Sequence, residues 1–198
     1  MTDRVGRGRF QIRLSPENER RVAAFDNAVD RAVLERLRGR RWADRLFYAA
    51  SELGDHGLIW LILGAARGLR SEHEWPAAVR LGIGVGVESV LVNIGIKSLF
   101  RRERPFFDGP RPFRLRTPRT SSFPSGHATS AFTAAALLSD GDRMAPLYYG
   151  AAIVVAASRV HVKIHHASDV VAGVAVGMVL GRIGRKLFPL PYRPDPES

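Results

Sequence analysis

The chain has 198 residues, of which 45% are hydrophobic, and a formal net charge of +11 at pH 7. That length and apolar content are enough for one domain with a hydrophobic core. The absence of cysteine excludes disulfide frameworks and thiolate metal sites. The positive charge predicts an anionic partner. Because the arginines flank apolar stretches and lack interleaved aromatic residues, an anionic lipid is favoured over nucleic acid.

The N-terminal quarter is basic and amphipathic. Residues 1–14 are rich in arginine with no apolar stretch behind them, which predicts a flexible basic arm and no secretory signal. Ser15-Pro16 has the pattern of a helix start. Apolar residues then recur at helical spacing on both sides of a break at Gly39, so residues 15–53 are predicted to form amphipathic helices on a membrane surface. A soluble helix packed on a core is the alternative. The apolar residues are Val22, Phe25, Val29, Val33, Leu37, Trp42, Leu46, Ala49 and Leu53.

Five apolar segments follow, at residues 54–70, 79–100, 126–140, 145–161 and 168–187. Since a membrane crossing needs about 20 residues, several of them are short, and hydropathy alone leaves a soluble helical bundle open. Glycines recur at spacings that let helices approach closely. They are Gly82, Gly84, Gly86, Gly173, Gly177 and Gly181. Residues 54–188 are predicted to form one all-α domain, followed by a Pro-rich surface tail at 189–198.

Three clusters of polar residues lie at the ends of these segments. They are Lys97 with Arg104-Pro105, then Pro124-Ser125-Gly126-His127, then Ser158-Arg159 followed by His165 and Asp169. The hydrolysis of a phosphate ester needs fixed cations, oriented N–H groups, a nucleophile and an acid. The clusters supply all of these, so together they predict a phosphate site.

The second and third clusters suggest roles for individual residues. Ser125 is expected to cap a helix that begins at Gly126, so that free N–H groups face the anion. His127 follows at the start of that helix, near a leaving-group oxygen, and Arg159 offers a planar fork for two phosphoryl oxygens. A carboxylate, Asp169, can hold one nitrogen of a histidine as N–H and leave the other nucleophilic.

The three clusters read K-x6-R-P, P-S-G-H and S-R-x5-H-x3-D, and in this order they resemble the pattern of the type 2 phosphatidic acid phosphatase superfamily over residues 50–188. The wider relatives of that superfamily include soluble acid phosphatases and vanadium haloperoxidases. The resemblance implies an integral-membrane helical bundle with about five transmembrane helices plus an N-terminal amphipathic helix. Family members often carry six spans, so the first is expected to be missing here.

The resemblance also implies a mechanism. His165 would attack phosphorus to give a phosphohistidine, oriented by Asp169, and His127 would protonate the leaving group and then activate water. His161 and His166 compete for the nucleophile's place, and only the family spacing selects His165. The phosphate would be bound by Lys97, Arg104, Ser125, Gly126 and Arg159. No metal or cofactor is expected, because fixed cations would stabilise the developing charge.

Three further ionisable residues are candidates for accessory roles. Asp55 and His56 are expected on the same side as the site and could line its entrance. Glu88 lies inside an apolar segment, where an ionisable residue is often functional. A polar contact to a neighbouring helix is the alternative for Glu88.

The implied substrate is a lipid phosphate held in a membrane. Phosphatidic acid, a prenyl phosphate or diphosphate, and a polyprenyl-linked sugar phosphate such as decaprenylphosphoryl-5-phosphoribose all fit. The compact layout without a signal sequence resembles small actinobacterial family members acting on the last of these. A catalytically silent basic membrane scaffold is the alternative from another class, and a soluble-type acid phosphatase or haloperoxidase relative is a further one. The sequence does not predict an oligomeric state.

The distribution of basic residues predicts which way the protein faces. With five spans, 22 Lys and Arg residues lie on the side of the phosphate site and eight on the other. The positive-inside rule then places the site on the cytoplasmic face of a bacterial cell membrane. Relatives of the undecaprenyl diphosphate phosphatase kind are thought to act outside, which conflicts with this orientation.

Overall fold

The computed structural model describes residues 14–118 and 120–191, which are all-helical with no strand among them. Most of the predicted basic arm and the end of the predicted tail lie outside these residues. The helices are α1 Pro16–Arg36, α2 Arg41–Leu53, α3 Leu58–Gly68, α4 Trp75–Val90, α5 Lys97–Leu99, α6 Gly126–Leu138, α7 Ala145–His161 and α8 Ala167–Leu187. The π-helical segment Leu91–Ile96 joins α4 to α5, and 3-10 turns at Asp55–Gly57 and Glu72–Glu74 precede α3 and α4.

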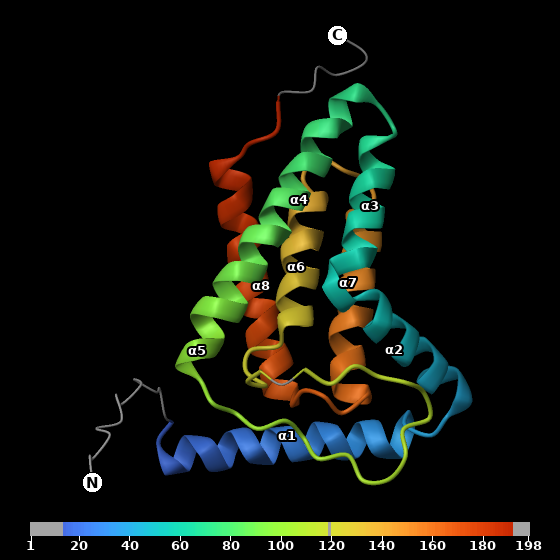
Figure 1. Cartoon of the computed structure of the whole chain (residues 1–198), viewed down its shortest axis with the longest axis vertical. Coiled ribbons are helices and arrows are strands. Elements are labelled where there is room, and N and C mark those ends of the chain that lie inside the picture. The colour runs from blue at the N-terminus through green and yellow to red at the C-terminus, as the bar shows by residue number, and fades with distance from the viewer. Residues whose placement is uncertain (1–13, 119, 192–198) are drawn as a thin grey trace, which may run out of the picture.

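Helices α3, α4, α6, α7 and α8 run along the long axis of the molecule, and α1 lies across one end of them (Figure 1). The loop residues 100–118 and 120–125 and the turn of residues 162–166 lie at that same end. The turns at residues 69–71 and 139–144 lie at the opposite end. The prediction of an all-α bundle preceded by a separate helix is therefore confirmed.

Local sequence signals account for several helix boundaries. Ser15 caps α1, since its Oγ accepts a hydrogen bond from the Asn18 N–H at 3.4 Å, and Pro16 follows as the first helical residue. The chain turns before α2 at Gly39, whose φ of +85° favours glycine. The span of α7 is the one predicted. The apolar segment predicted at residues 79–100 corresponds to the helix that ends at Leu99, which begins four residues earlier, at Trp75.

Helix α6 is the centre of the bundle and is buried along most of its length. Helix α8 packs closely against it through glycines. A Cβ atom added at Gly173 or Gly177 would lie only 2.6 or 2.5 Å from the backbone oxygens of Ser125 and Thr129. The predicted close approach is confirmed there. For Gly82 and Gly86 it is wrong, since an added Cβ would meet nothing within 4 Å.

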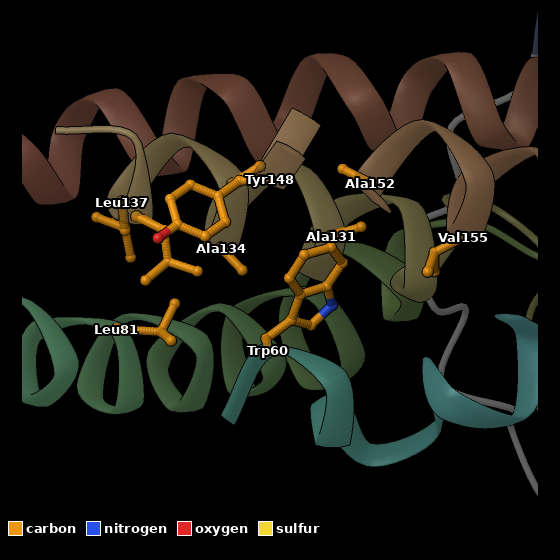
Figure 2. Close-up of a cluster of buried hydrophobic side chains, with 10 residues drawn as sticks. Trp60, Leu81, Ala131, Ala134, Leu137, Tyr148, Ala152 and Val155 are labelled. Carbon is orange, nitrogen blue, oxygen red and sulfur yellow. The ribbon is translucent and has the colours of Figure 1, made fainter. Parts of the chain in front are cut away.

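An apolar cluster fixes α6 against its other neighbours. Figure 2 shows Leu81 of α4 facing Leu137 of α6, and Trp60 of α3 extending toward α6 further along the cluster, which Tyr148 and Val155 of α7 complete. All five side chains are almost completely buried. Burial of this apolar surface fixes the position of α6, whose first turn contains Gly126 and His127 of the predicted phosphate site.

The outer surface of the bundle is apolar. Within the described residues, two helices are long and apolar enough to cross a membrane, Glu72–Leu99 and Ala167–Leu187. Only 22% and 28% of their most apolar stretches are buried inside the fold, so most of these residues face outward. The predicted five spans are thus not all recognised by length and composition. The predicted apolar stripe of α2 also faces outward, with Trp42, Leu46 and Leu53 exposed.

Candidate active site

A cavity of about 540 Å³ brings residues from the three polar clusters together. Helices α4, α5 and α6 and the loops before α6 and α8 all contribute to its walls. The predicted site residues that line it are Lys97, Arg104, Gly126, His127 and His165, together with Asp55 and Glu88. Ser125, Arg159 and Asp169 lie behind this lining and are at most 1% exposed. The residues predicted from separate parts of the sequence therefore surround one place.

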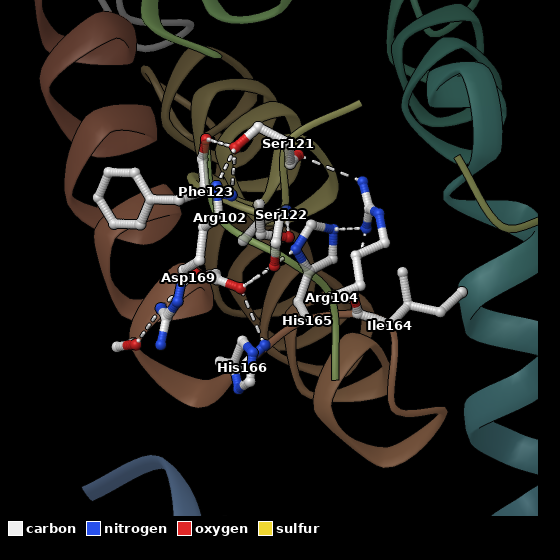
Figure 3. Close-up of polar contacts among 12 residues, drawn as sticks. Arg102, Arg104, Ser121, Ser122, Phe123, Ile164, His165, His166 and Asp169 are labelled. Carbon is white, nitrogen blue, oxygen red and sulfur yellow. Dashed lines mark hydrogen bonds and ion pairs between the residues drawn. The ribbon is translucent and has the colours of Figure 1, made fainter. Parts of the chain in front are cut away.

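His165 lies between Arg104 and Asp169 (Figure 3). Its Nε2 is 3.2 Å from Nη1 of Arg104, and its Nδ1 is 3.6 Å from Oδ2 of Asp169, an ion-pair distance rather than a hydrogen bond. A guanidinium can only donate, so Nε2 must accept, and the proton of the neutral ring is on Nδ1, facing the carboxylate. This tautomer leaves a lone pair on Nε2.

The surroundings of His165 keep the ring neutral. Its pKa is lowered to about 3, mainly by burial; Asp169 opposes this shift, and the charges of Arg159 and Arg104 add to it. A neutral imidazole is the form that can attack an electrophile. At neutral pH the side chain is therefore ready to act as a nucleophile without first losing a proton.

Asp169 is held by several donors. The backbone N–H of His166 donates to its Oδ2 at 2.9 Å, and Ser122 Oγ donates to the same oxygen. Nη1 of Arg102 donates to Oδ1 at 2.6 Å, and the side chain is fully buried. These contacts fix the plane of the carboxylate that faces His165.

The first turn of α6 lies beside Lys97. Ser125 caps the helix as predicted, with Oγ accepting from the Ala128 N–H at 3.5 Å. A Cβ atom added at Gly126 would be only 3.3 Å from Nζ of Lys97, and that ammonium donates to Oδ1 of Asn93 at 2.9 Å. The positive end of the helix dipole and a lysine thus share one side of the cavity.

Arg159 is 1% exposed and incompletely paired. Its Nη1 donates to Oγ of Ser51, whereas Nε and Nη2 are buried and have no acceptor in the protein. Buried donors are nearly always satisfied. A phosphoryl group offers the type of acceptor that two free guanidinium nitrogens require.

His127 has a carboxylate partner from a distant part of the chain. Its Nε2 lies 2.9 Å from Oδ1 of Asp55, which is carried by the 3-10 turn before α3. A carboxylate at this distance stabilises the protonated imidazole, the form that can act as an acid. Asp55 therefore lies closer to the reacting groups than a residue at the cavity entrance.

The other candidates are placed as follows. His161 is directed away from the cavity, since its Nε2 is 2.8 Å from Asp44 Oδ1 and its ring packs on Phe47. His166 is the N-cap of α8. Glu88 lines the cavity and is 3% exposed. The side chain of His56 lies outside the described residues.

Sequence reasoning missed four residues that hold the site together. Ser51 contacts Arg159, and Asn93 contacts Lys97. Arg102 and Ser122 both contact Asp169. Arg102 and Ser122 adjoin the recognised clusters, so proximity to these clusters could have suggested them. Nothing in the sequence pairs Ser51 with Arg159, which is 108 residues away. In the described part of the chain, no group of three or more His, Cys, Asp or Glu residues could hold a metal ion.

Several known proteins resemble this chain in sequence. The family model of the PAP2 superfamily matches residues 77–191. Decaprenylphosphoryl-5-phosphoribose phosphatase of Mycobacterium tuberculosis is 41% identical over 137 residues, covering 67% of this chain and 73% of that protein. The protein of the same name from Mycolicibacterium smegmatis is 36% identical over 155 residues, covering 75% and 81%.

A solved structure shares the fold. The transmembrane PAP2 type phosphatidylglycerolphosphate phosphatase from Bacillus subtilis superposes with a TM-score of 0.64 over 87% of both chains, at 22% sequence identity. At that identity the likeness concerns the arrangement of helices.

Proposed function

The chain belongs to the PAP2 superfamily, and we propose that it is a membrane phosphatase that removes the phosphate from a polyprenyl-linked sugar phosphate of the decaprenylphosphoryl-5-phosphoribose type. The single observation that carries the catalytic part is the placement of His165, with Nε2 facing Arg104 and Nδ1 facing Asp169. The substrate class is supported by the two mycobacterial relatives, whose names state that activity.

The proposed reaction has two in-line displacements. In the first, Nε2 of His165 attacks phosphorus, the bond from phosphorus to the leaving oxygen breaks, and His127 gives that oxygen a proton. In the second, His127 takes a proton from water, the water oxygen attacks phosphorus, and the phosphorus–nitrogen bond breaks. Inorganic phosphate leaves, and His165 is neutral again.

The remaining predicted residues stabilise charge in this scheme. Lys97, Arg104 and Arg159 neutralise the phosphoryl oxygens, and the N–H groups after Ser125 and Gly126 add hydrogen bonds. Asp169 keeps the proton of His165 on Nδ1, as an orienting carboxylate does in a catalytic triad. With these fixed cations the reaction needs no metal.

Glu88 and Asp55 have separate proposed roles. Asp55 stabilises the protonated form of His127. Glu88 lines the cavity together with Ser89 of α4 and Asn93 of the π-helical segment, and it accepts hydrogen bonds from hydroxyl groups of the headgroup. Beyond these polar residues the cavity is lined by Leu61 and Val85 of α3 and α4, which suits the start of a lipid tail.

We further propose five spans, formed by α3, α4 through α5, α6, α7 and α8. Their alternating direction along one axis supports this (Figure 1). Helix α6 has 13 residues, a length of about 20 Å against a hydrocarbon core of about 30 Å. A short helix is tolerated because its neighbours, rather than lipid, surround it. Helix α1 then lies along the membrane surface at the cavity end.

The test of function is phosphate release by the purified protein in detergent with a chelator present. Decaprenylphosphoryl-5-phosphoribose, phosphatidic acid, farnesyl diphosphate and glycerol 3-phosphate would be compared as substrates. We expect turnover of the first to exceed that of the others, and its loss in His165→Ala and His127→Ala. His73→Ala is the matched control, because His73 is exposed and lies in the 3-10 turn before α4, at the opposite end of the bundle. Turnover of the soluble ester alone would refute a lipid substrate.

Orientation can be tested in intact cells, since the chain has no native cysteine. We propose that the cavity faces the cytoplasm, as the excess of basic residues at that end supports. A Pro110→Cys variant in the loop at the cavity end should then resist a membrane-impermeant maleimide, and a Ser71→Cys variant at the opposite end should react. The reverse pattern would contradict this orientation.

A further inference from the structure

Helix α1 buries a carboxylate against the catalytic end of the bundle. Within Pro16–Arg36, Asp26 is the buried residue, at 5% exposure, whereas the apolar Phe25 beside it is 46% exposed. An amphipathic helix normally buries its apolar face. Carboxylates are seldom buried unless they are paired, so the partners of Asp26 explain why it lies there.

These partners are Arg102 and Ser168. Oδ2 of Asp26 accepts from Nη2 of Arg102 at 2.6 Å and from Oγ of Ser168 at 2.9 Å. Its Oδ1 accepts from the backbone N–H of Ser168 at 2.8 Å. Asp26 therefore holds both a cation and the backbone of the first turn of α8.

Both partners of Asp26 are connected to Asp169. Arg102 uses its other terminal nitrogen, Nη1, to donate to Oδ1 of Asp169 at 2.6 Å, and Figure 3 shows the guanidinium beside that carboxylate. Ser168 precedes Asp169 in the chain. The side chain of Arg102 is 28% exposed. Without Asp26 it could therefore turn toward solvent, and Asp169 would lose a charged partner.

We propose that Asp26 is a positioning residue for the nucleophile, acting through Arg102 and Asp169 on His165. The carboxylate of Asp26 sets where Arg102 donates, Arg102 sets the plane of the Asp169 carboxylate, and Asp169 sets the ring of His165. Asp26 lies outside residues 77–191, the part matched by the family model. The N-terminal helix thus takes part in preparing the catalytic histidine.

The same helix offers a matched control. Asp30, one turn further along α1, also pairs with cations, Arg38 at 2.9 Å and Lys163 at 3.2 Å. Those pairs attach α1 to the bundle but do not include Arg102 or Asp169. Asp30→Asn therefore weakens the docking of α1 and leaves the contacts of Asp169 in place.

The inference rests on the proposed phosphatase activity, so the test begins with wild-type turnover of decaprenylphosphoryl-5-phosphoribose in detergent. Asp26→Asn and Arg102→Gln should each lower kcat by about 10- to 100-fold, the loss typical of groups that orient a reactive residue from behind. The KM should change by less than about 3-fold, because neither residue contacts the substrate. Asp30→Asn should keep kcat within about 3-fold of wild type. Thermal unfolding of each variant establishes that it is folded.

A double-mutant cycle separates positioning from general stabilisation. If Asp26 acts through Asp169, then Asp26→Asn should lower the residual kcat of Asp169→Asn by less than about 2-fold. A full additional loss in that background, an equal loss in Asp30→Asn, or wild-type kcat in both Asp26→Asn and Arg102→Gln would each overturn the inference while the activity itself stands. A wild-type protein without turnover would overturn the proposed function as well.

Discussion

Arg67 and Arg159 are equally buried, at 2% and 1% exposure, but only Arg67 has an acceptor for each of its nitrogens. Its Nε donates to Glu74 at 2.7 Å, and its terminal nitrogens donate to the carbonyl oxygens of Leu138 and Asp140. Arg159 leaves Nε and Nη2 without an acceptor. The two arginines lie at opposite ends of the bundle and should respond in opposite ways to replacement by methionine.

Arg67→Met should destabilise the protein by about 3–5 kcal/mol, because it breaks the buried ion pair with Glu74 and removes the donor to the carbonyl oxygens of Leu138 and Asp140. Chemical or thermal unfolding in detergent measures this. The activity of the folded fraction should remain near that of wild type, since the cavity is at the other end. A variant as stable as wild type would show that these contacts contribute nothing.

Arg159→Met should leave stability unchanged or raise it by up to about 1–4 kcal/mol, because it removes a buried charge that the protein pairs poorly. Phosphate release should fall by at least about 100-fold, the loss expected when one donor to a developing charge is removed. The same unfolding and turnover assays apply. Lowered stability with retained turnover would mean that Arg159 has a structural role instead.

His165 should remain neutral over the physiological pH range. Its pKa of about 3 in the folded protein lies below the value of about 6.5 for an unperturbed histidine. Between these values the unfolded chain binds more protons, so this residue makes stability fall as the pH drops through that window. NMR of ¹³C-labelled histidine should show no titration of the His165 ring between pH 5 and 8.

Arg104→Gln provides the control for that titration. Because the charge of Arg104 contributes to lowering the pKa of His165, its removal should move the midpoint of the His165 signal upward. An unchanged midpoint would show that the charge of Arg104 does not contribute to the pKa of His165.

Gly173→Ala should destabilise the protein by about 1–3 kcal/mol, although alanine favours helices, because the new Cβ would lie 2.6 Å from the carbonyl oxygen of Ser125. Separation of α8 from the first turn of α6 should also lower kcat. At Gly150 of α7 an added Cβ meets nothing within 4 Å, so Gly150→Ala should stabilise by up to about 1 kcal/mol. Thermal unfolding of the two variants side by side makes the comparison. Equal effects would show that close packing at Gly173 is unimportant.

The helices were predictable where the chain carries local signals. Ser15 and Pro16 mark the start of α1, and the apolar run at 145–161 coincides with α7. The π-helical segment Leu91–Ile96 was not predictable, because nothing in its sequence distinguishes a π-helical turn from a continuation of the α-helix. The close helix approach predicted for Gly82 and Gly86 was wrong, because the sequence does not show what surrounds a glycine. A small residue at helical spacing can serve helix packing or a cavity, and only the fold distinguishes these.

The site residues that belong to the three polar clusters could be predicted from the sequence. Lys97, Arg104, His127 and His165 are recognisable because residues of suitable chemistry recur in one order along the chain, and the cavity contains them. Two of their supporting partners, Ser51 and Asp26, come from parts of the sequence far from these clusters. Asp26 is 142 residues from Ser168, and one of several acidic residues on α1 carries no periodic signal that would reveal its partner.

The closeness of Lys97, Arg104 and Arg159, each of which acts electrostatically on another, has a thermodynamic consequence. Like charges held together oppose folding, and an anion seated among them relieves that opposition. We therefore expect inorganic phosphate, the reaction product, to stabilise the folded protein. At 100 times its dissociation constant it would add about 2.7 kcal/mol to the stability of the native state. We then expect the phosphate-inhibited protein to resist heat better than the ligand-free protein.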